Sequence, residues 1–390
     1  MASIFARRMQ ELGTETAFEV LAKAKALEKQ GREIIHLEIG EPDFDTPKNI
    51  RDAATKAMNS GYTHYVPAAG IPEFRETIAE YISKTRNIDV RPEEVVVTPG
   101  AKPIIFFGVL ACVEVGNEVM YPNPGFPIYE SMIKFLGAKP VPMVLKEENN
   151  FAIDTEDTVE KISDKTKMII LNFPENPTGG VLTRENLEAI ADKVKDRDDL
   201  IIVSDEVYSR CIYEGEHRSI ASLPGMKEKT AIIDGFSKTY AMTGWRLGYG
   251  VMRKDLAEKL TQLMINSNSC TCAFSQIAGI EALRGPQNEA EKMVEQFKRR
   301  REVIVSGLNK INGITCKKPQ ATFYVFPNVK GVNMDSRKLP DFLLNKAGVA
   351  ALSGSAFGEY GRGYMRFSFA NSIPNIEKAL KQIEEALQAL

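Results

Sequence analysis

The sequence of 390 residues contains few of the residues that mark several protein classes. It has 5 cysteines, 3 histidines and 1 tryptophan. The cysteines are odd in number and scattered, which excludes a disulfide framework and favours reduced thiols in a cytoplasmic protein. Cys270 and Cys272 form a close pair, but no histidine and no second pair accompany them. We therefore expect no metal site of the cysteine or histidine type.

The sequence also lacks an excess of either charge and any long apolar run. Its 50 basic and 52 acidic residues give a net charge of −2, so no bulk positive field attracts nucleic acid or an anionic membrane. The longest apolar run, Pro103 to Val113, is far shorter than the ~20 residues that a membrane-spanning helix needs. The first residues carry arginines without a following apolar core, so no secretory signal is expected. These features predict a cytoplasmic globular protein without nucleic-acid or membrane partners.

The middle of the chain alternates apolar, β-rich runs with helical stretches. The runs are Val95–Val97, Glu118–Tyr121, Met168–Leu171, Leu200–Val203 and Ala231–Ile233. Strands that alternate with helices indicate βαβ units and a mostly parallel sheet. The length favours two domains. We therefore expect a large α/β domain over residues 48–285.

The two ends of the chain have a different pattern. Residues 17–30 place Phe18, Leu21, Ala24 and Leu27 at helical spacing. Residues 286–310 are typical of one long charged helix, short strands are expected at 322–326 and 365–368, and an amphipathic helix ends the chain. These segments predict a smaller α+β domain built from residues 1–47 and 286–390.

A lysine follows the last of the predicted strands of the large domain. Residues 231–238 form a strand, a glycine turn and Lys238, and the next residues are apolar and aromatic and include Trp245. A lysine is ordinarily a solvated surface charge, but desolvation lowers its pKa and makes the neutral amine a nucleophile. Ser237 and Arg246 flank it with a hydroxyl and a fixed cation, which suit an anion.

Three further strand ends carry polar groups, and ligands of open α/β sheets bind at such ends. Asp205 directly follows a buried strand and Tyr208 lies three residues further on; a turn or helix-capping aspartate is the alternative. Asn176 lies in a loop rich in proline and glycine that would otherwise be a simple turn. Gly100, Ala101 and Lys102 begin an apolar helix, where free backbone N–H groups bind anions.

Together these elements match the protein groups that pyridoxal phosphate requires. They offer a lysine for a Schiff base, a carboxylate for the pyridine nitrogen, an Asn/Tyr pair for the ring oxygen and donors for the phosphate. The combination is much more specific than any single element.

The motifs identify a family resemblance over nearly the whole chain. The pattern Ser-Lys-x-x-x-x-x-Gly-Trp-Arg-x-Gly occupies residues 237–248 and Asn-Pro-Thr-Gly occupies residues 176–179. With the segments 39–44 and 364–368, the sequence resembles the class I, aspartate aminotransferase-like family of fold-type I pyridoxal-phosphate enzymes. The resemblance implies a seven-stranded, mostly parallel sheet between helices in the large domain.

The resemblance also implies a role for each cofactor residue. Lys238 would bond to the cofactor and carry the proton of the substrate Cα, Asp205 would pair with the pyridine nitrogen, and Asn176 and Tyr208 would bind the ring oxygen. The phosphate would be surrounded by Gly100, Ala101, Lys102, Ser237 and Arg246. Phe126 would stack on the ring, and Tyr65 would reach the cofactor of a neighbouring subunit in a homodimer.

Substrate contacts follow from the same resemblance. Arg366 would bind the substrate α-carboxylate, with help from Asn176 and the backbone of Gly40. The implied reaction moves an amino group between an L-amino acid and a 2-oxo acid. The resemblance further implies cis peptides at Asn123–Pro124 and Asn176–Pro177.

The side-chain specificity stays open in the sequence. Phe126 stands where many aspartate enzymes have tryptophan, residues 261–283 contain no arginine, and the segment around Glu19 lacks the small hydroxyl residues of some relatives. Lys102 would contact a distal carboxylate, or would only balance the phosphate or face solvent. An aspartate- or glutamate-type aminotransferase is the first expectation. The alternatives are a broad, aromatic or neutral specificity, a pyridoxal-phosphate lyase, and a regulatory protein with an inactive aminotransferase domain.

Overall fold

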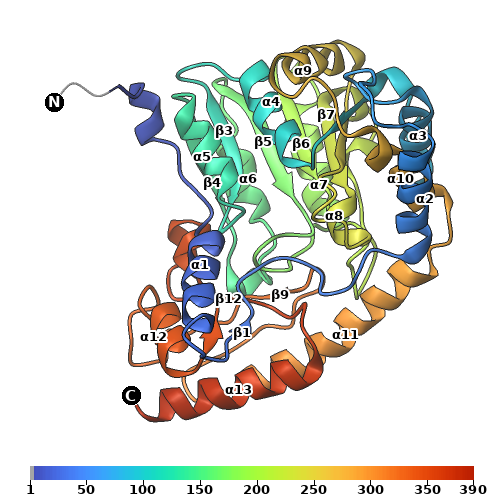
Figure 1. The fold of residues 1–390 in the computed structure, drawn as a ribbon. Coiled ribbons are helices and arrows are strands. Elements are labelled where there is room, and N and C mark those ends of the chain that lie inside the picture. The colour runs from blue at the N-terminus through green and yellow to red at the C-terminus, as the bar shows by residue number, and fades with distance from the viewer. Residues whose placement is uncertain (1–3) are drawn as a thin grey trace.

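The computed structural model describes residues 4–390 and is built around one seven-stranded sheet (Figure 1). The strands are β2 (Val95–Thr98), β3 (Glu118–Asn123), β4 (Lys139–Val144), β5 (Thr166–Asn172), β6 (Ile201–Asp205), β7 (Thr230–Gly235) and β8 (Gly248–Val251). Their order is β2-β8-β7-β6-β5-β3-β4. Only β8 runs antiparallel to its neighbours in this sheet. The predicted mostly parallel α/β fold is confirmed.

All five predicted strands of this sheet are present, whereas β4 and β8 were not predicted. β4 is an edge strand and contains Pro140 and Pro142, which interrupt a strand-like pattern but are tolerated at an edge. β8 reads Gly-Tyr-Gly-Val and carries no apolar run. Glycine is favoured at position 250, because an added Cβ would lie 2.9 Å from Ile104 Cγ2.

Helices cover both faces of the sheet. One layer contains α4 (Lys102–Cys112), α5 (Ile128–Phe135) and α9 (Lys254–Ser267). The other contains α2 (Lys48–Asn59), α3 (Pro72–Arg86), α6 (Thr155–Glu160), α7 (Arg184–Val194) and α10 (Ala273–Arg284). Alternating residues of β5 show this arrangement, because Ile170 packs in the first layer and Ile169 in the second. A short helix, α8 (Phe236–Thr239), directly follows β7.

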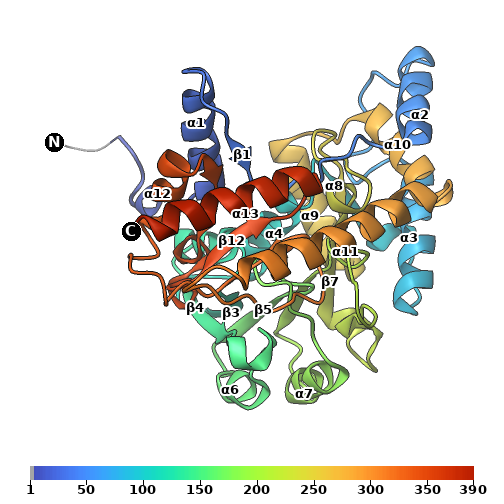
Figure 2. The same cartoon turned by 90° about the horizontal axis from the view of Figure 1, so that it is seen from below.

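Segments from the two chain ends meet below the large sheet (Figures 1 and 2). β1 (Ile35–His36) pairs in parallel with β10 (Val349–Ala350), and β12 (Met365–Ser368) lies between β11 (Leu352–Ser353) and β9 (Tyr324–Val325). The helices of this part are α1 (Thr16–Glu28), α11 (Asn288–Leu308), α12 (Leu339–Lys346) and α13 (Ile373–Gln388). The division into residues 48–285 and the two terminal segments stays a prediction.

The two terminal helices differ in how well their sequence pattern predicts burial. In α13 the predicted apolar stripe holds, with Ile376 and Ile383 buried. In α1 only Ala24 is buried, and Phe18 is 60% exposed. The helix predicted from the spacing of Phe18, Leu21, Ala24 and Leu27 is present, but Phe18 lies beside a cavity that is described below.

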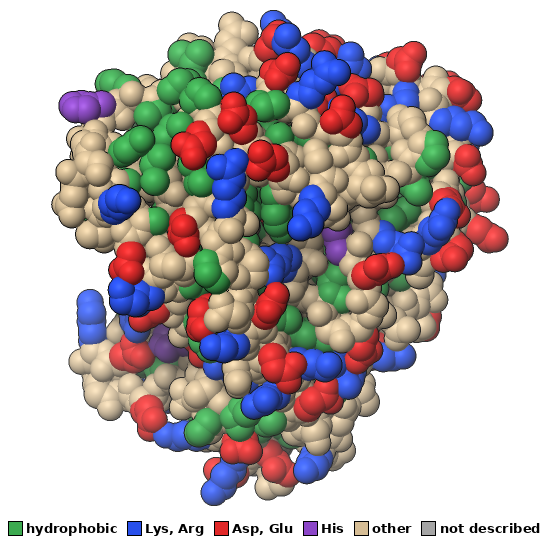
Figure 3. All heavy atoms as spheres, turned by 90° about the vertical axis from the view of Figure 1, so that its right-hand side faces the viewer, with side chains coloured by type: hydrophobic (Ala, Val, Ile, Leu, Met, Phe, Trp, Pro, Cys, Tyr) green, Lys and Arg blue, Asp and Glu red, His purple; other side chains and the backbone are tan. Residues whose placement is uncertain are grey.

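Charged side chains of both signs are mixed over the face that carries α2, α3 and α10 (Figure 3). Among residues 4–390, no helix is both long and apolar enough to cross a membrane. Within the same residues, no group of three or more His, Cys, Asp or Glu side chains is arranged to hold a metal ion.

Candidate active site

A cavity of about 500 Å³ lies at the carboxyl ends of the central strands. Most of the site residues predicted from the sequence line it. They are Gly40, Ala101, Lys102, Phe126, Asn176, Asp205, Tyr208, Ser237, Lys238, Arg246 and Arg366. Neighbouring parallel strands end at one edge of the sheet, so residues far apart in the sequence converge there. β12 and the segment before α1 close the other side of the cavity.

Lys238 lies on α8 with its amine inside the cavity. Its Nζ donates a hydrogen bond to the carbonyl oxygen of Gly40 at 2.6 Å. Burial, and after it the positive charge of Arg366, lowers the pKa of Lys238 to about 8. The predicted low pKa is thus supported, since the amine exchanges its proton close to neutral pH.

The aromatic surroundings of Lys238 differ from those expected. The Phe323 ring lies 6.0 Å from its Nζ. Trp245 instead donates its Nε1–H to Thr46 Oγ1 at 2.9 Å, outside this cavity. Trp245 therefore does not line the cavity, whereas its neighbours Gly244 and Arg246 do.

Asp205 ends β6 and is buried. Its Oδ2 accepts a hydrogen bond from Tyr129 Oη at 2.7 Å, and its Oδ1 accepts one from the Val207 N–H at 3.4 Å. Burial raises the pKa of Asp205 to about 6, and the negative charges of Asp234 and Glu206 act in the same direction. The two hydrogen bonds oppose this rise by stabilising the carboxylate. Asp205 is therefore poised to be ionised at neutral pH and to favour a positive partner.

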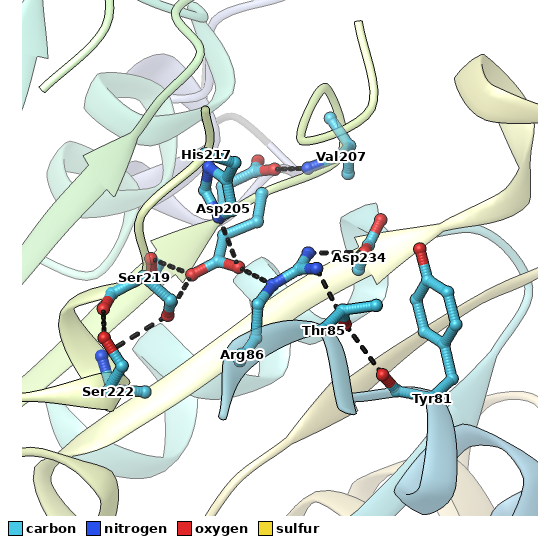
Figure 4. A network of polar contacts seen from close by, with 12 residues as sticks. Tyr81, Thr85, Arg86, Asp205, Val207, His217, Ser219, Ser222 and Asp234 are labelled. Atoms are coloured by element: carbon cyan, nitrogen blue, oxygen red, sulfur yellow. Dashed lines mark hydrogen bonds and ion pairs between the residues drawn. The ribbon is translucent and has the colours of Figure 1, made fainter. Parts of the chain in front are cut away.

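The residue next to Asp205, Glu206, belongs to a separate buried network that includes Arg86, His217 and Ser219, which are labelled in Figure 4. Arg86 donates to Glu206 through Nε at 2.7 Å and to Asp234 through Nη2 at 3.1 Å. His217 Nε2 lies 2.8 Å from the Glu206 carboxylate. Despite complete burial, the charges of His217 and Arg86 hold the pKa of Glu206 well below its usual range. This network fixes the end of β6 and hence the position of Asp205.

The start of α4 and Arg246 form an anion-binding corner. Gly100 has φ of +85°, and an added Cβ would lie 2.3 Å from Arg246 Nη2. Gly100 itself does not line the cavity, but its neighbours Ala101 and Lys102 do, together with Ser237. Arg246 forms no ion pair with any residue of the described part of the chain. A helix N-terminus, a hydroxyl and an unpaired guanidinium suit a phosphate group.

Lys102 is paired with an acidic residue that the sequence analysis did not select. Its Nζ forms an ion pair with Glu15, which precedes α1. The same Nζ lies 5.4 Å from the centre of the Phe126 ring. Lys102 is therefore neither an unpaired surface charge nor an unpaired cation of the cavity.

Arg366 on β12 is buried between two aromatic rings. Its guanidinium carbon lies 4.4 Å from the Tyr324 ring centre and 4.8 Å from that of Phe357. Its Nη1 donates to Asn176 Oδ1 at 3.1 Å, Nη2 donates to the Glu38 carbonyl, and Nε has no partner. Arg366 has no ion-pair partner among residues 4–390. A buried cation without a counter-ion favours a carboxylate ligand.

The remaining predicted residues complete the floor of the cavity. Tyr208 Oη lies 2.8 Å from Tyr324 Oη. An added Cβ at Gly40 would lie 1.9 Å from Tyr324 Oη, so glycine is required at that position. Asn176 lies in a buried turn that is held by the preceding residue, Glu175, whose Oε2 accepts from the Thr178 N–H at 2.7 Å. The peptides Asn123–Pro124 and Asn176–Pro177 are cis as predicted, and Phe173–Pro174 is a further cis peptide.

Besides Gly100, Tyr65 is the predicted site residue that does not line the cavity. Its side chain is 88% exposed. Conversely, the cavity or its supports include residues that sequence reasoning missed. They are Glu15, Phe18, Glu41, Tyr129 and Tyr324. Glu15, Phe18, Tyr129 and Tyr324 lie in or beside helices or in a short strand, where no motif marked them. Glu41 lies in segment 39–44, which was noted for its resemblance but not for this residue.

Comparisons with known proteins agree with this geometry. Residues 32–383 match the family described as aminotransferase class I and II. The chain is 42% identical over 372 residues to an aspartate aminotransferase of Pyrococcus horikoshii, with 95% of this chain and 94% of the relative covered. It is 39% identical to aromatic-amino-acid aminotransferase 2 of Thermococcus litoralis, with 91% and 92% covered. The structure of Thermus thermophilus aspartate aminotransferase with maleate superposes with a TM-score of 0.93 at 35% identity, covering 99% of this chain and 100% of that chain.

Proposed function

This chain belongs to the class I and II aminotransferase family, and on that premise we propose that it uses pyridoxal phosphate to move an amino group between an L-amino acid and a 2-oxo acid. One observation carries the proposal. A single cavity contains a lysine with a lowered pKa, a buried carboxylate and a buried arginine without a counter-ion. These three groups match a proton carrier, a partner for a ring nitrogen and a partner for a substrate carboxylate.

The donor set of the cavity fits the cofactor. The N-terminus of α4, Ser237 and Arg246 would hold the phosphate, and Phe126 would lie against the ring. Asp205 would face the pyridine nitrogen, and Asn176 and Tyr208 would bind the ring oxygen. The space that Gly100 leaves for Arg246 supports the phosphate assignment, because a side chain there would displace the guanidinium. When bound, pyridoxal phosphate supplies an electron-withdrawing ring that stabilises the negative charge left at the substrate Cα.

Lys238 is proposed to move the proton at the substrate Cα. With a pKa of about 8 its amine is available as a base near neutral pH. The Gly40 carbonyl holds Nζ on the side of the cavity that also contains Arg366. The same nitrogen therefore serves both as the attachment point for the cofactor and as the proton carrier.

Asp205 is proposed to keep the ring nitrogen protonated. A buried carboxylate stabilises a neighbouring cation more strongly than an exposed one, because little water screens the charge. Tyr129 supports this role, since its hydroxyl donates to the carboxylate and so favours the ionised form.

Arg366 is proposed to bind and orient the substrate α-carboxylate. Its stacking on Tyr324 and its hydrogen bond to Asn176 fix the guanidinium plane before substrate arrives. A two-point contact to a carboxylate then restricts rotation about the substrate Cα and points the Cα hydrogen toward a fixed base.

The similarity to aspartate aminotransferases supports an acidic donor, with glutamate and 2-oxoglutarate as one substrate pair. A broad or aromatic specificity is the second candidate. It is favoured by Phe18 and Phe126 in the cavity wall and by the similarity to an aromatic-amino-acid aminotransferase.

A homodimer is proposed as the functional unit, with Tyr65 of one protomer at the cavity of its partner. Tyr65 is strongly exposed, and Met58 and Tyr62 nearby are 43% and 41% exposed. Such apolar exposure is typical of a surface covered by another subunit. Sedimentation velocity on the active enzyme tests this, since a fully active monomer would exclude shared sites.

A cytoplasmic location is also proposed, and the five cysteines, all free thiols, support it. Cell fractionation tests this location.

The proposed reaction is tested by its first half. The purified enzyme is mixed with one amino acid at a time, without a 2-oxo acid acceptor, and the cofactor spectrum and the 2-oxo acid product are measured. We expect conversion of the cofactor to its amino form and one equivalent of 2-oxo acid per site. Release of ammonia or carbon dioxide, without the amino form, would favour a lyase instead.

A further inference from the structure

The ion pair between Glu15 and Lys102 places a negative charge in the wall of the cavity. Glu15 is the residue that precedes α1, but its carboxylate accepts no hydrogen bond from the free N–H groups of that helix. Instead it reaches Lys102 at the start of α4, 87 residues away in the sequence. The Glu15 side chain is only 18% exposed, against 45% for Lys102. The carboxylate thus lies on the inner side of the pair.

The electrostatic surroundings of the reactive amine place this pair close to the chemistry. Burial and the positive charges of Arg366 and Lys102 lower the pKa of Lys238, whereas the negative charges of Glu41 and Glu15 raise it. Glu15 and Lys102 therefore both act on Lys238 from the same cavity.

The cations of the cavity decide whether a charged substrate side chain can form an ion pair there. On the proposed function, the phosphate occupies Arg246 and the α-carboxylate occupies Arg366. Lys238 would be bonded to the cofactor, so Lys102 is the remaining cation of the cavity wall, and Glu15 already neutralises it. A second carboxylate on the substrate therefore has no unpaired cation to meet.

The wall around the pair is apolar. Ala17, Phe18, Ile39, Ile105 and Phe126 line the same cavity. The Phe126 ring lies against the Lys102 amine, and Phe18 extends from the first turn of α1 beside Glu15. While Glu15 and Lys102 are paired, this part of the cavity wall carries no net charge and offers a surface for an apolar or aromatic side chain.

We propose that Glu15 is a specificity-determining residue: its ion pair with Lys102 admits apolar and aromatic amino acids directly, and a dicarboxylic amino acid binds only after it displaces Glu15 from Lys102. This proposal rests on the proposed aminotransferase function and assigns its side-chain subsite. Glu15 acts through Lys102 and also repels a distal carboxylate directly, since both carry the same charge.

A purely structural role for Glu15 predicts something different. If the pair only anchored α1 to α4, weakening it would loosen the cavity for every substrate alike. Glu15→Gln separates the two cases, because the amide oxygen still accepts a hydrogen bond from Lys102 while the competing charge is lost. Glu19→Gln is the matched control, since Glu19 lies one turn further on α1, is exposed and does not line the cavity.

The experiment measures both binding and turnover on the purified holoenzyme. The binding probes are maleate, a dicarboxylate without an amino group, and 3-phenylpropionate, a monocarboxylate with an aromatic ring. The turnover substrates are aspartate and phenylalanine. In Glu15→Gln we expect the ratio of the Kd of maleate to that of 3-phenylpropionate to fall by about tenfold, the scale of one charged hydrogen bond. The kcat/KM ratio of aspartate to phenylalanine should rise by a similar factor, through KM for aspartate rather than kcat.

Two results would overturn the assignment of Glu15. One is an equal change for the dicarboxylate and the aromatic ligand, which would indicate a structural role. The other is the same shift in Glu19→Gln, which would indicate a general charge effect. Absence of transamination with any amino acid in the wild type would refute the proposed function, and the two binding probes would still decide the role of Glu15.

Discussion

Removal of the Tyr129 hydroxyl should change the pH range in which the protein binds its cofactor. Tyr129 Oη donates to Asp205 at 2.7 Å, whereas the other donor, the Val207 N–H, is at 3.4 Å. Tyr129→Phe keeps the ring, which packs edge-on against Phe126 with centroids 5.7 Å apart. The variant therefore removes mainly the stronger of the two hydrogen bonds that stabilise the Asp205 carboxylate.

The magnitude follows from the hydrogen bond. A hydrogen bond to a charged group contributes ~1.5–3 kcal/mol, and each pKa unit corresponds to ~1.4 kcal/mol, so the shift is ~1–2 units. The pKa of Asp205, about 6 in the wild type, should rise to ~7–8 in the variant. The direction is upward, because the lost bond stabilised the ionised form. At neutral pH the variant would therefore hold a largely neutral Asp205, which attracts a protonated ring nitrogen much less.

The assay is the dissociation constant of pyridoxal phosphate from the cofactor-free enzyme, measured between pH ~5 and ~9. In the wild type, affinity should weaken as the pH falls through the pKa of Asp205. In Tyr129→Phe the same weakening should begin ~1–2 pH units higher. Titrations of the cofactor itself are common to both proteins and cancel in the difference.

Tyr121→Phe is the control for the loss of a buried tyrosine hydroxyl. Tyr121 Oη accepts a hydrogen bond from Asn123 at 3.2 Å and does not contact Asp205. Its pH dependence should match the wild type. An unchanged or lower midpoint in Tyr129→Phe would refute the role of this hydrogen bond in setting the charge of Asp205.

Three further predictions concern other parts of the site. Lys238→Ala should abolish the visible absorbance of the lysine-bound cofactor, which absorption spectra will show. It should also reduce turnover in steady-state assays by ~10²–10⁴-fold, the range for loss of a proton-transferring group. Lys102→Ala should lower the kcat/KM ratio of aspartate to phenylalanine by ~10-fold or more, because Glu15 then stands unpaired in the cavity; an equal loss for both donors would assign Lys102 to the cofactor alone. Arg86→Met should cost ~3–5 kcal/mol in urea unfolding, since it leaves Glu206 and Asp234 buried without their cation. That loss should be larger at pH ~8 than at pH ~5, because without Arg86 the buried carboxyls favour the protonated form, which is less available at the higher pH. A loss that does not depend on pH would contradict the ion-pair explanation.

The sequence by itself determined the fold class and most of the residues that line the cavity. Asp205, Asn176 and Lys238 each follow an apolar run of β-rich residues, and the parallel arrangement of such runs places their carboxyl ends at one edge. The order of Ser237, Lys238 and Arg246 was informative for a different reason. These residues lie within one short stretch of sequence, which by itself limits the distance between them in space.

Only the tertiary structure decided which distant side chains contact these residues and their neighbours. Tyr129 reaches Asp205 from α5, Glu15 reaches Lys102 from the segment before α1, and Arg86 reaches Glu206 from α3. Each pair is separated by more than seventy residues. Such contacts depend on how helices pack on the sheet and on whether water is excluded from the resulting cavity. Neither property is contained in a local pattern, which explains why Tyr129 and Glu15 carried no signal in the sequence although both touch residues that did.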